Sequence, residues 1–175
     1  MATTADEVWV RVVGRGTFQN SQPLRRFTLD RMQHGYRRFT VDVGDCTGMD
    51  STFLGVLAGV GLRLRQDGRT DARVRLVRVG QRNLELLQTL GLDRLLVVVQ
   101  ETPDEPAGGL QWEWLPDSDI ESLSKPLDKD ETTDLMLSAH DNLIQADQRN
   151  APRFQTVTKF LRDSLERRRN QPSSQ

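Results

Sequence analysis

Residues 46–61, CTGMDSTFLGVLAGVG, combine side chains that can carry chemistry with a glycine-dotted apolar run. Asp50, Ser51 and Thr52 stand at the mouth of this run, where a helix is predicted to begin. A helix N-terminus has unpaired backbone N–H groups and positive partial charge, so a hydroxyl there usually caps the helix. A phosphate at the same place would meet those N–H groups. Two interpretations of Ser51 therefore stay open: a helix cap or a charge switch.

A second chemical group consists of Asp42, Asp45 and Asp50, near the end of a predicted parallel strand, where α/β proteins bind ligands. These carboxylates suggest a metal-dependent aspartate that accepts a phosphoryl group. Such a site also needs a cation from a neighbouring strand, and residues 1–100 contain no lysine. The spacing DVGDCTG also differs from the usual DxDx[TV]. We keep this interpretation as the less favoured alternative.

Sequence motifs for enzymes and metal sites are missing. There is no GxSxG, GxxxxGK or HExxH. His34 and His140 are far apart and have no cysteine cluster, so each is interpreted as a surface or packing histidine. Cys46, the single cysteine, cannot form an internal disulfide and is expected to fill space near a strand end. We predict that the protein is not an enzyme and that it has no catalytic residue, no cofactor and no metal ion.

Charge divides the chain into two halves. Residues 1–100 hold 15 Arg and no Lys against 10 Asp and Glu, a net charge of +5, whereas residues 101–175 hold 9 Lys and Arg against 15 Asp and Glu, a net charge of −6. The halves either touch or serve different partners. The N-terminus does not resemble a signal peptide and no apolar run is long enough to span a membrane, so a cytoplasmic location is expected.

Hydrophobic periodicity predicts the order β-α-β-α-β-α-β for the first hundred residues, and hence a mostly parallel sheet covered by helices. The expected segments are 7–13, 21–35, 38–45, 49–68, 72–79, 81–92 and 94–100, with a turn at 14–17. Ser21 is expected to cap the first helix, with Pro23 in an early position. Gly91 is expected to adopt the left-handed conformation that ends the third helix. The last strand is apolar throughout, as if both its faces were buried.

Gly55 and Gly59 lie inside the predicted helix 49–68, where each glycine costs about 1 kcal/mol relative to alanine. We expect close packing of this helix against the sheet to compensate for this cost. A helix held rigidly in this way would keep the Ser51 hydroxyl, at its N-terminus, on the surface.

The remainder of the chain has a different composition. Residues 101–131 are an acidic linker, and we expect Trp112 and Trp114 to anchor it on the body. Residues 132–175 predict a helical hairpin and a frayed tail, with apolar stripes that need a partner. We expect the hairpin to pack separately from the body, and a homodimer is one arrangement that would bury the stripes. The expected contacts are Leu143, Phe154, Val157 and Leu161.

Two stretches together resemble a known family: VDVGDCTGMDSTFLGVLAGVGLRLRQDG, which contains D-x-x-x-M-D-S-[ST], and LLQTLGLDRLLVV. They are similar to a STAS domain, the fold of bacterial anti-sigma factor antagonists, over residues 7–100. The resemblance implies an α/β fold in residues 1–100: a STAS-like, mostly parallel sheet with helices packed on it. The C-terminal helical hairpin extension lies outside the resemblance and is predicted from its periodicity alone. The family usually has glycine where Phe53 stands.

The resemblance also implies a function in transcription regulation by signal transduction. Asp50 matches the motif aspartate, Ser51 the phosphoacceptor and Thr52 its neighbour, and we predict that these residues and Phe53 bind the partner. That partner is a serine kinase that is also the anti-sigma factor. Partner switching would follow: the unphosphorylated protein sequesters the anti-sigma factor, the phosphoprotein releases it, and a serine phosphatase resets the cycle. Direct contact with nucleic acid or membrane is not expected. The alternative is a non-phosphorylated STAS scaffold or small-ligand sensor.

Overall fold

The N-terminal part of the chain forms a sheet whose inner strands run parallel. The structure is a computed structural model that describes residues 2–3, 7–101 and 125–170. The strand order is β1-β2-β4-β6-β7, and only β1 is antiparallel to its neighbour. The strands are β1 (Ala2–Thr3), β2 (Glu7–Arg11), β4 (Arg38–Asp42), β6 (Arg73–Val77) and β7 (Val97–Val98). The predicted mostly parallel sheet is confirmed.

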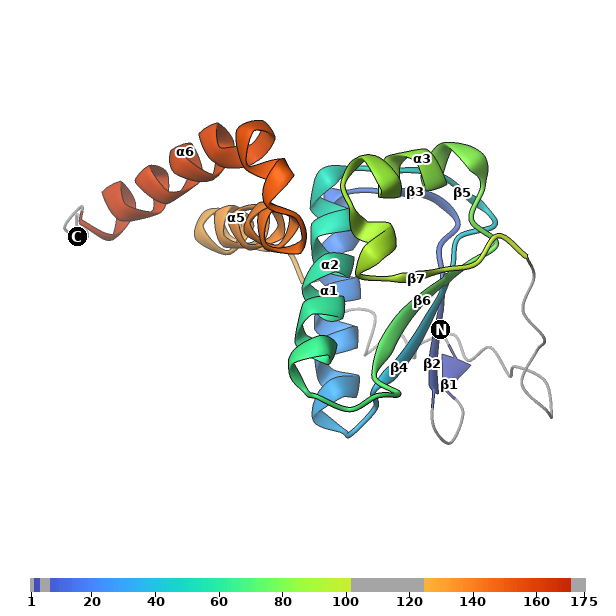
Figure 1. The fold of residues 1–175 in the computed structure, drawn as a ribbon. Coiled ribbons are helices and arrows are strands. Elements are labelled where there is room, and N and C mark those ends of the chain that lie inside the picture. Colours follow the sequence, from blue (N-terminus) through green and yellow to red (C-terminus); the bar gives the residue numbers. More distant parts are fainter. Residues whose placement is uncertain (1, 4–6, 102–124, 171–175) are drawn as a thin grey trace.

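Helices α1 (Phe18–Gln33) and α2 (Ser51–Gln66) lie side by side against one face of this sheet (Figure 1). Helix α3 (Gln81–Thr89) lies nearer the carboxyl ends of the strands. Large aliphatic and aromatic side chains between these layers form the core, because their burial removes apolar surface from water. Its large, fully buried side chains include Phe39, Leu54, Leu57, Leu64, Leu76 and Leu87.

Two predictions around the start of α1 were wrong: the first residue of the helix and the turn that precedes it. Helix α1 begins at Phe18, not at residue 21, because Thr17 N donates to Asn20 Oδ1 at 2.7 Å and closes the first turn. Ser21 lies inside the helix and donates to the Thr17 carbonyl at 2.8 Å. The predicted turn at 14–17 contains β3 (Gly14–Gly16), which pairs with β5 (Cys46–Met49) in a separate small parallel sheet.

The strand predicted at 94–100 is much shorter than expected. Gly91 adopts φ +67°, which confirms its predicted left-handed conformation, and a 3-10 turn, η1 (Leu92–Arg94), follows it. The chain then pairs with β6 only over Val97–Val98. Val97 is 44 % exposed, so the expectation that both faces of this strand are buried was wrong.

The C-terminal hairpin packs on the body. Helix α5 (Lys129–Ala146) crosses α2, and α6 (Ala151–Arg169) returns along α5 after a 3-10 turn, η2 (Gln148–Asn150) (Figure 1). Leu135, Ala139 and Leu143 are fully buried. The expectation of separate packing was therefore wrong, although the predicted apolar stripes do meet one another.

Polar contacts also tie the hairpin to the body. Asn150 Nδ2 donates to the Leu90 carbonyl at 2.9 Å, and Arg94 pairs with Asp147. Helix α5 begins at Lys129 rather than 132, because Asp128 caps it. Trp112 and Trp114 lie outside the described residues. Within the described residues, no helix has the length and apolarity that crossing a membrane requires.

Candidate functional site

Asp50 fixes the start of α2 and ties it to α1. Its Oδ1 accepts from Phe53 N at 2.9 Å, and its Oδ2 accepts from Phe18 N at 2.7 Å, so one carboxylate caps two helices. Its own N–H donates to the Gly16 carbonyl at 2.9 Å. Asp50, not Ser51, is therefore the N-cap. Ser51 is the first helical residue, and its hydroxyl is not needed for capping.

The Ser51 hydroxyl instead bonds to the hairpin. Ser51 Oγ lies 3.1 Å from Nε2 of His140, a residue of α5. The other ring nitrogen, His140 Nδ1, lies 2.8 Å from the carbonyl of Met136 in the same helix. A carbonyl only accepts, so the neutral imidazole carries its proton on Nδ1 and Nε2 accepts the Ser51 proton. Burial lowers the pKa of His140 and favours this neutral form, although the Met136 carbonyl and the charges of Asp141 and Asp50 act in the opposite direction.

His140 was missed as a site residue. Its ring is 8 % exposed and lies against Phe154 of α6, with ring centroids 5.1 Å apart. It is thus a packing histidine, as interpreted from the sequence, but one that also touches the predicted phosphoacceptor. Nothing in the local sequence indicates this, because 88 residues separate the two positions.

The other two predicted partner-binding residues are buried. Thr52 is 5 % and Phe53 2 % exposed. The Phe53 ring occupies the space beside Gly16, where an added Cβ would come within 2.7 Å of it. Glycine at position 16 therefore accommodates the aromatic ring at 53. Asp50 and Ser51 remain partly exposed.

Gly55 and Gly59 face the hairpin, not the sheet. A Cβ at Gly55 would collide with the Ala139 backbone, and one at Gly59 would collide with the Asn142 side chain. Asn142 Nδ2 donates to the Gly55 carbonyl at 3.1 Å. The expected close approach exists, but α5 makes it, so the predicted partner of these glycines was wrong.

The remaining carboxylates of the predicted cluster are paired with arginine. Arg78 donates to Asp42 at 2.8 and 2.7 Å and to Asp45 at 3.3 Å, and Arg11 donates to Asp42 at 3.1 Å. Burial raises the pKa of Asp42, but the Arg78, Gly44 amide and Arg11 bonds outweigh burial and leave it lowered. In the described part of the chain, no three His, Cys, Asp or Glu side chains gather as a metal site would require.

Comparisons with known proteins fit this geometry. The family model described as Mlab, STAS domain matches residues 1–99. The chain belongs to the STAS domain family. A solved structure, that of a candidate anti-sigma factor antagonist from Thermotoga maritima, has a TM-score of 0.51 and 20 % identity, and covers 57 % of this chain and 82 % of that one. At this identity the likeness concerns the fold. No curated protein matches.

The family match ends before the hairpin begins. Ser51 and Asp50 belong to the STAS domain, whereas His140 and Asn142 come from an extension to it. The surface around the start of α2, which carries the predicted phosphoacceptor, is thus already in contact with another part of the same chain.

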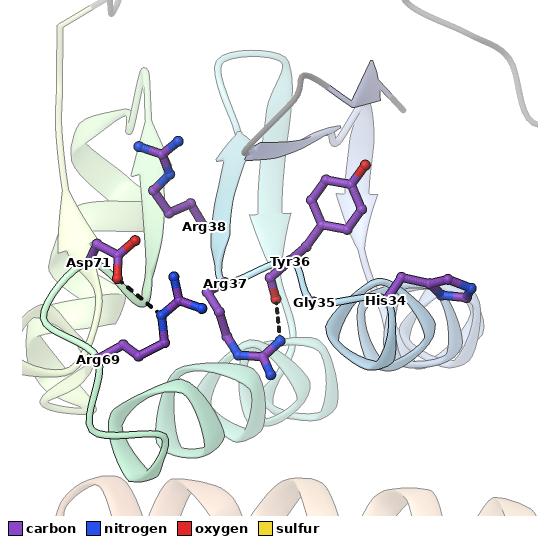
Figure 2. Close-up of a pocket in the computed structure, with 7 residues that line it drawn as sticks. All are labelled: His34, Gly35, Tyr36, Arg37, Arg38, Arg69 and Asp71. Carbon is purple, nitrogen blue, oxygen red and sulfur yellow. Dashed lines mark hydrogen bonds and ion pairs between the residues drawn. The ribbon is translucent and has the colours of Figure 1, made fainter.

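The STAS domain also has a basic pocket of about 450 Å³ at the opposite, amino edge of its strands (Figure 2). Arg37 donates there to the Met32 and Tyr36 carbonyls at 2.7 and 2.9 Å, and it pairs with Asp67. Arg69 lies 3.5 Å from Asp71. Arg37 thus stabilises the carbonyl end of α1 and the following loop. The pocket is lined by His34, Gly35, Tyr36, Arg37, Arg38, Arg69 and Asp71.

Proposed function

We propose that this STAS domain protein is an anti-sigma factor antagonist regulated by phosphorylation of Ser51. The observation that carries the proposal is the capping by Asp50, which leaves the Ser51 hydroxyl at the helix start free of any capping role. Ser51 is partly exposed at the point where α1 and α2 both begin. The family match over residues 1–99 and the likeness to the Thermotoga maritima protein support the same function.

The partner would be a serine kinase that is also the anti-sigma factor. It would transfer the γ-phosphoryl group of ATP to Ser51 Oγ: the O–H bond breaks, an O–P bond forms, the proton passes to a base of the kinase, and ADP leaves. The antagonist is the substrate in this step. Asp50 and Ser51 would contact the partner, while Thr52 and Phe53 would support them from beneath.

Switching follows from electrostatics. A phosphoserine carries nearly two negative charges at neutral pH. In an interface those charges would lose water beside the Asp50 carboxylate, without a cation to match them, which is strongly unfavourable. The unphosphorylated protein would hold the anti-sigma factor and the phosphoprotein would release it. A serine phosphatase would restore the hydroxyl by hydrolysing the O–P bond.

One observation favours the second candidate, a STAS scaffold that is not phosphorylated. The Ser51 hydroxyl already has a partner inside the chain, His140. In this alternative the bond is permanent and serves only to hold α5.

Phosphate mapping separates the two functions. The full chain is incubated with ATP and an ATP-binding fraction from the cells that make it, and peptides are sequenced by mass spectrometry. We expect phosphate on Ser51, none in Ser51→Ala, and retention of the kinase by the unphosphorylated chain only. Phosphate on Thr52 with Ser51 unmodified would contradict the proposal. So would the absence of phosphate from both residues in the full chain and also in its Gly55→Ala variant, whose methyl group would collide with α5.

A further inference from the structure

We infer that the α5–α6 hairpin is an intramolecular ligand of the α2 surface, and that its docking and a phosphate on Ser51 exclude each other. The inference rests on the proposed function for the identity of the modification. It adds a regulatory partner, the chain's own helix α5, which competes with the kinase for the surface around Ser51.

The first argument is steric. Helix α5 crosses α2 at Gly55 and Gly59: a Cβ at Gly55 would collide with the Ala139 backbone, and a Cβ at Gly59 would collide with the Asn142 side chain. His140 lies against Ser51 one turn before Gly55. A kinase that must reach Ser51 Oγ would meet His140 at hydrogen-bonding distance from the reacting atom. The docked hairpin therefore protects Ser51.

The second argument concerns the proton. In the docked state the Ser51 hydroxyl donates and the neutral His140 Nε2 accepts. Phosphoryl transfer removes that proton, so an oxygen acceptor would face a nitrogen acceptor. Protonation of His140 would repair the contact, but burial lowers its pKa. The phosphate also adds negative charge near Asp50, the N-cap of α2, and Asp141 of α5, whose charges both act on His140. Arg162 pairs with Asp141 at 2.8 Å, so Asp50 is the stronger source of repulsion.

The third argument concerns what separation would cost. Leu135, Ala139 and Leu143 of α5 are fully buried, and Leu135 and Leu143 belong to the same hydrophobic core as α2, so opening exposes them to water.

The polar contacts add little to this apolar contribution. Asn142 provides one hydrogen bond to the Gly55 carbonyl, and Arg25 approaches Asp134 at 3.7 Å on the partly exposed rim. Exposed ion pairs contribute little. The second attachment, from Asn150 to the Leu90 carbonyl, lies at the hairpin turn and does not involve Ser51. The family match defines the STAS domain by residues 1–99, without the hairpin, so we expect phosphate on Ser51 to raise the fraction of molecules in which α5 has left α2 while this domain stays folded.

Thermodynamic linkage makes the two effects reciprocal. If docking disfavours phosphate on Ser51 at equilibrium, then phosphate on Ser51 weakens docking by the same factor, whereas the rate of the kinase reaction carries no such reciprocity. The inference can therefore be tested without the kinase, by placing the phosphate first.

The experiment compares hydrogen exchange in the full chain with and without phosphoserine at position 51, introduced during translation by codon suppression. Because a buried acceptor would lose its donor, we expect at least about tenfold faster exchange across 129–146. Exchange in β4 and β6 should not change. Ser51→Ala, which loses the donor without adding charge, should give a smaller increase. Gln66→Glu adds a charge at an exposed position at the far end of α2 and should give none.

Gly55→Ala opens the interface independently of Ser51, because its methyl group would collide with the Ala139 backbone. Its matched control is Gly48→Ala, since a Cβ there meets no atom within 4 Å. We expect faster exchange in α5 for Gly55→Ala only. If phosphoserine leaves exchange in α5 at the wild-type rate while Gly55→Ala raises it, the coupling is refuted. If neither changes α5, or if phosphoserine unfolds β4 and β6 as well, the hairpin is part of the core and the inference also fails. None of these results depends on finding a kinase, so the proposed function stands or falls separately.

Discussion

Helix α2 has two buried sides that are built differently. One side carries Leu54, Leu57 and Leu64, each at most 1 % exposed, which belong to the main hydrophobic core. The other carries Ser51, Gly55 and Gly59 at helical spacing and meets α5 through a close contact with the Ala139 backbone and through hydrogen bonds. Leu135 and Leu143 of α5 are fully buried and extend the same hydrophobic core. The first side buries large apolar side chains, which is the dominant source of folding stability. The difference teaches that a buried side of a helix can be built from large apolar side chains or from small residues that let a second helix approach closely.

The largest effect should come from the core side of α2. Leu57→Ala removes a side chain that is 1 % exposed, and the cavity and lost transfer energy should reduce the free energy of unfolding by about 2–5 kcal/mol. Urea denaturation followed by circular dichroism measures this loss, and Val13→Ala, at a residue that is 72 % exposed, is the control. A stability equal to wild type would mean that this side of α2 does not anchor the domain.

A smaller and local effect is expected on the hairpin side. Asn142→Ala removes the hydrogen bond to the Gly55 carbonyl and should lower the free energy of opening of α5 by about 1 kcal/mol. Global unfolding should change little, because the STAS core is untouched. Hydrogen exchange resolved by peptide gives both values. Gln145→Ala, at an exposed position of α5, should match wild type. An equal loss in α5 and in β4 would show that the two sides of α2 unfold together.

The smallest effect should be a pH dependence of docking. Burial lowers the pKa of His140 below its ordinary value near 6.5. When α5 leaves, the imidazole regains that ordinary value and binds protons more readily. Docking should thus be at full strength above about pH 6.5 and should weaken as the pH falls through the lowered pKa. Asp50 and Asp141 partly oppose this shift, so the change should be modest.

Exchange in α5 at several pH values between 5.5 and 7.5, corrected for intrinsic rates, tests this dependence. His140→Gln keeps a side-chain acceptor but does not titrate, so its docking should be flat over the same range. A wild-type profile as flat as that of His140→Gln would contradict the neutral, buried assignment of His140.

The sequence predicted the fold of the STAS domain correctly, but it did not predict where the hairpin packs. Alternating apolar strands and the left-handed position of Gly91 depend on local chemistry, and both were predicted correctly. The pair Gly55 and Gly59 correctly indicated a close approach, but small residues serve helix–sheet and helix–helix contacts alike, so the choice of partner was wrong. The first turn of α1 was misplaced because Thr17 and Asn20 close it, ahead of the more conspicuous Ser21.

The candidate site shows the same limit. Asp50 and Ser51 were identified from the motif, but the double capping by Asp50 depends on Phe18 N, which only the tertiary fold brings near. The burial of Phe53 depends on Gly16 in the same way. His140 carries no local signal, because its role arises from contacts with α2 and α6 that are remote in sequence.

Because α5 and α2 belong to the same chain, the concentration of the protein does not affect how often they are in contact. Closure of the hairpin is unimolecular, so the closed fraction is the same at every expression level of the protein, whereas binding of a separate partner rises with that partner's abundance. A partner that competes with α5 would see its apparent affinity reduced by the fraction of molecules that are open. The hairpin would thus raise the partner concentration at which half of the molecules are bound, and a stronger α2–α5 contact would raise it further.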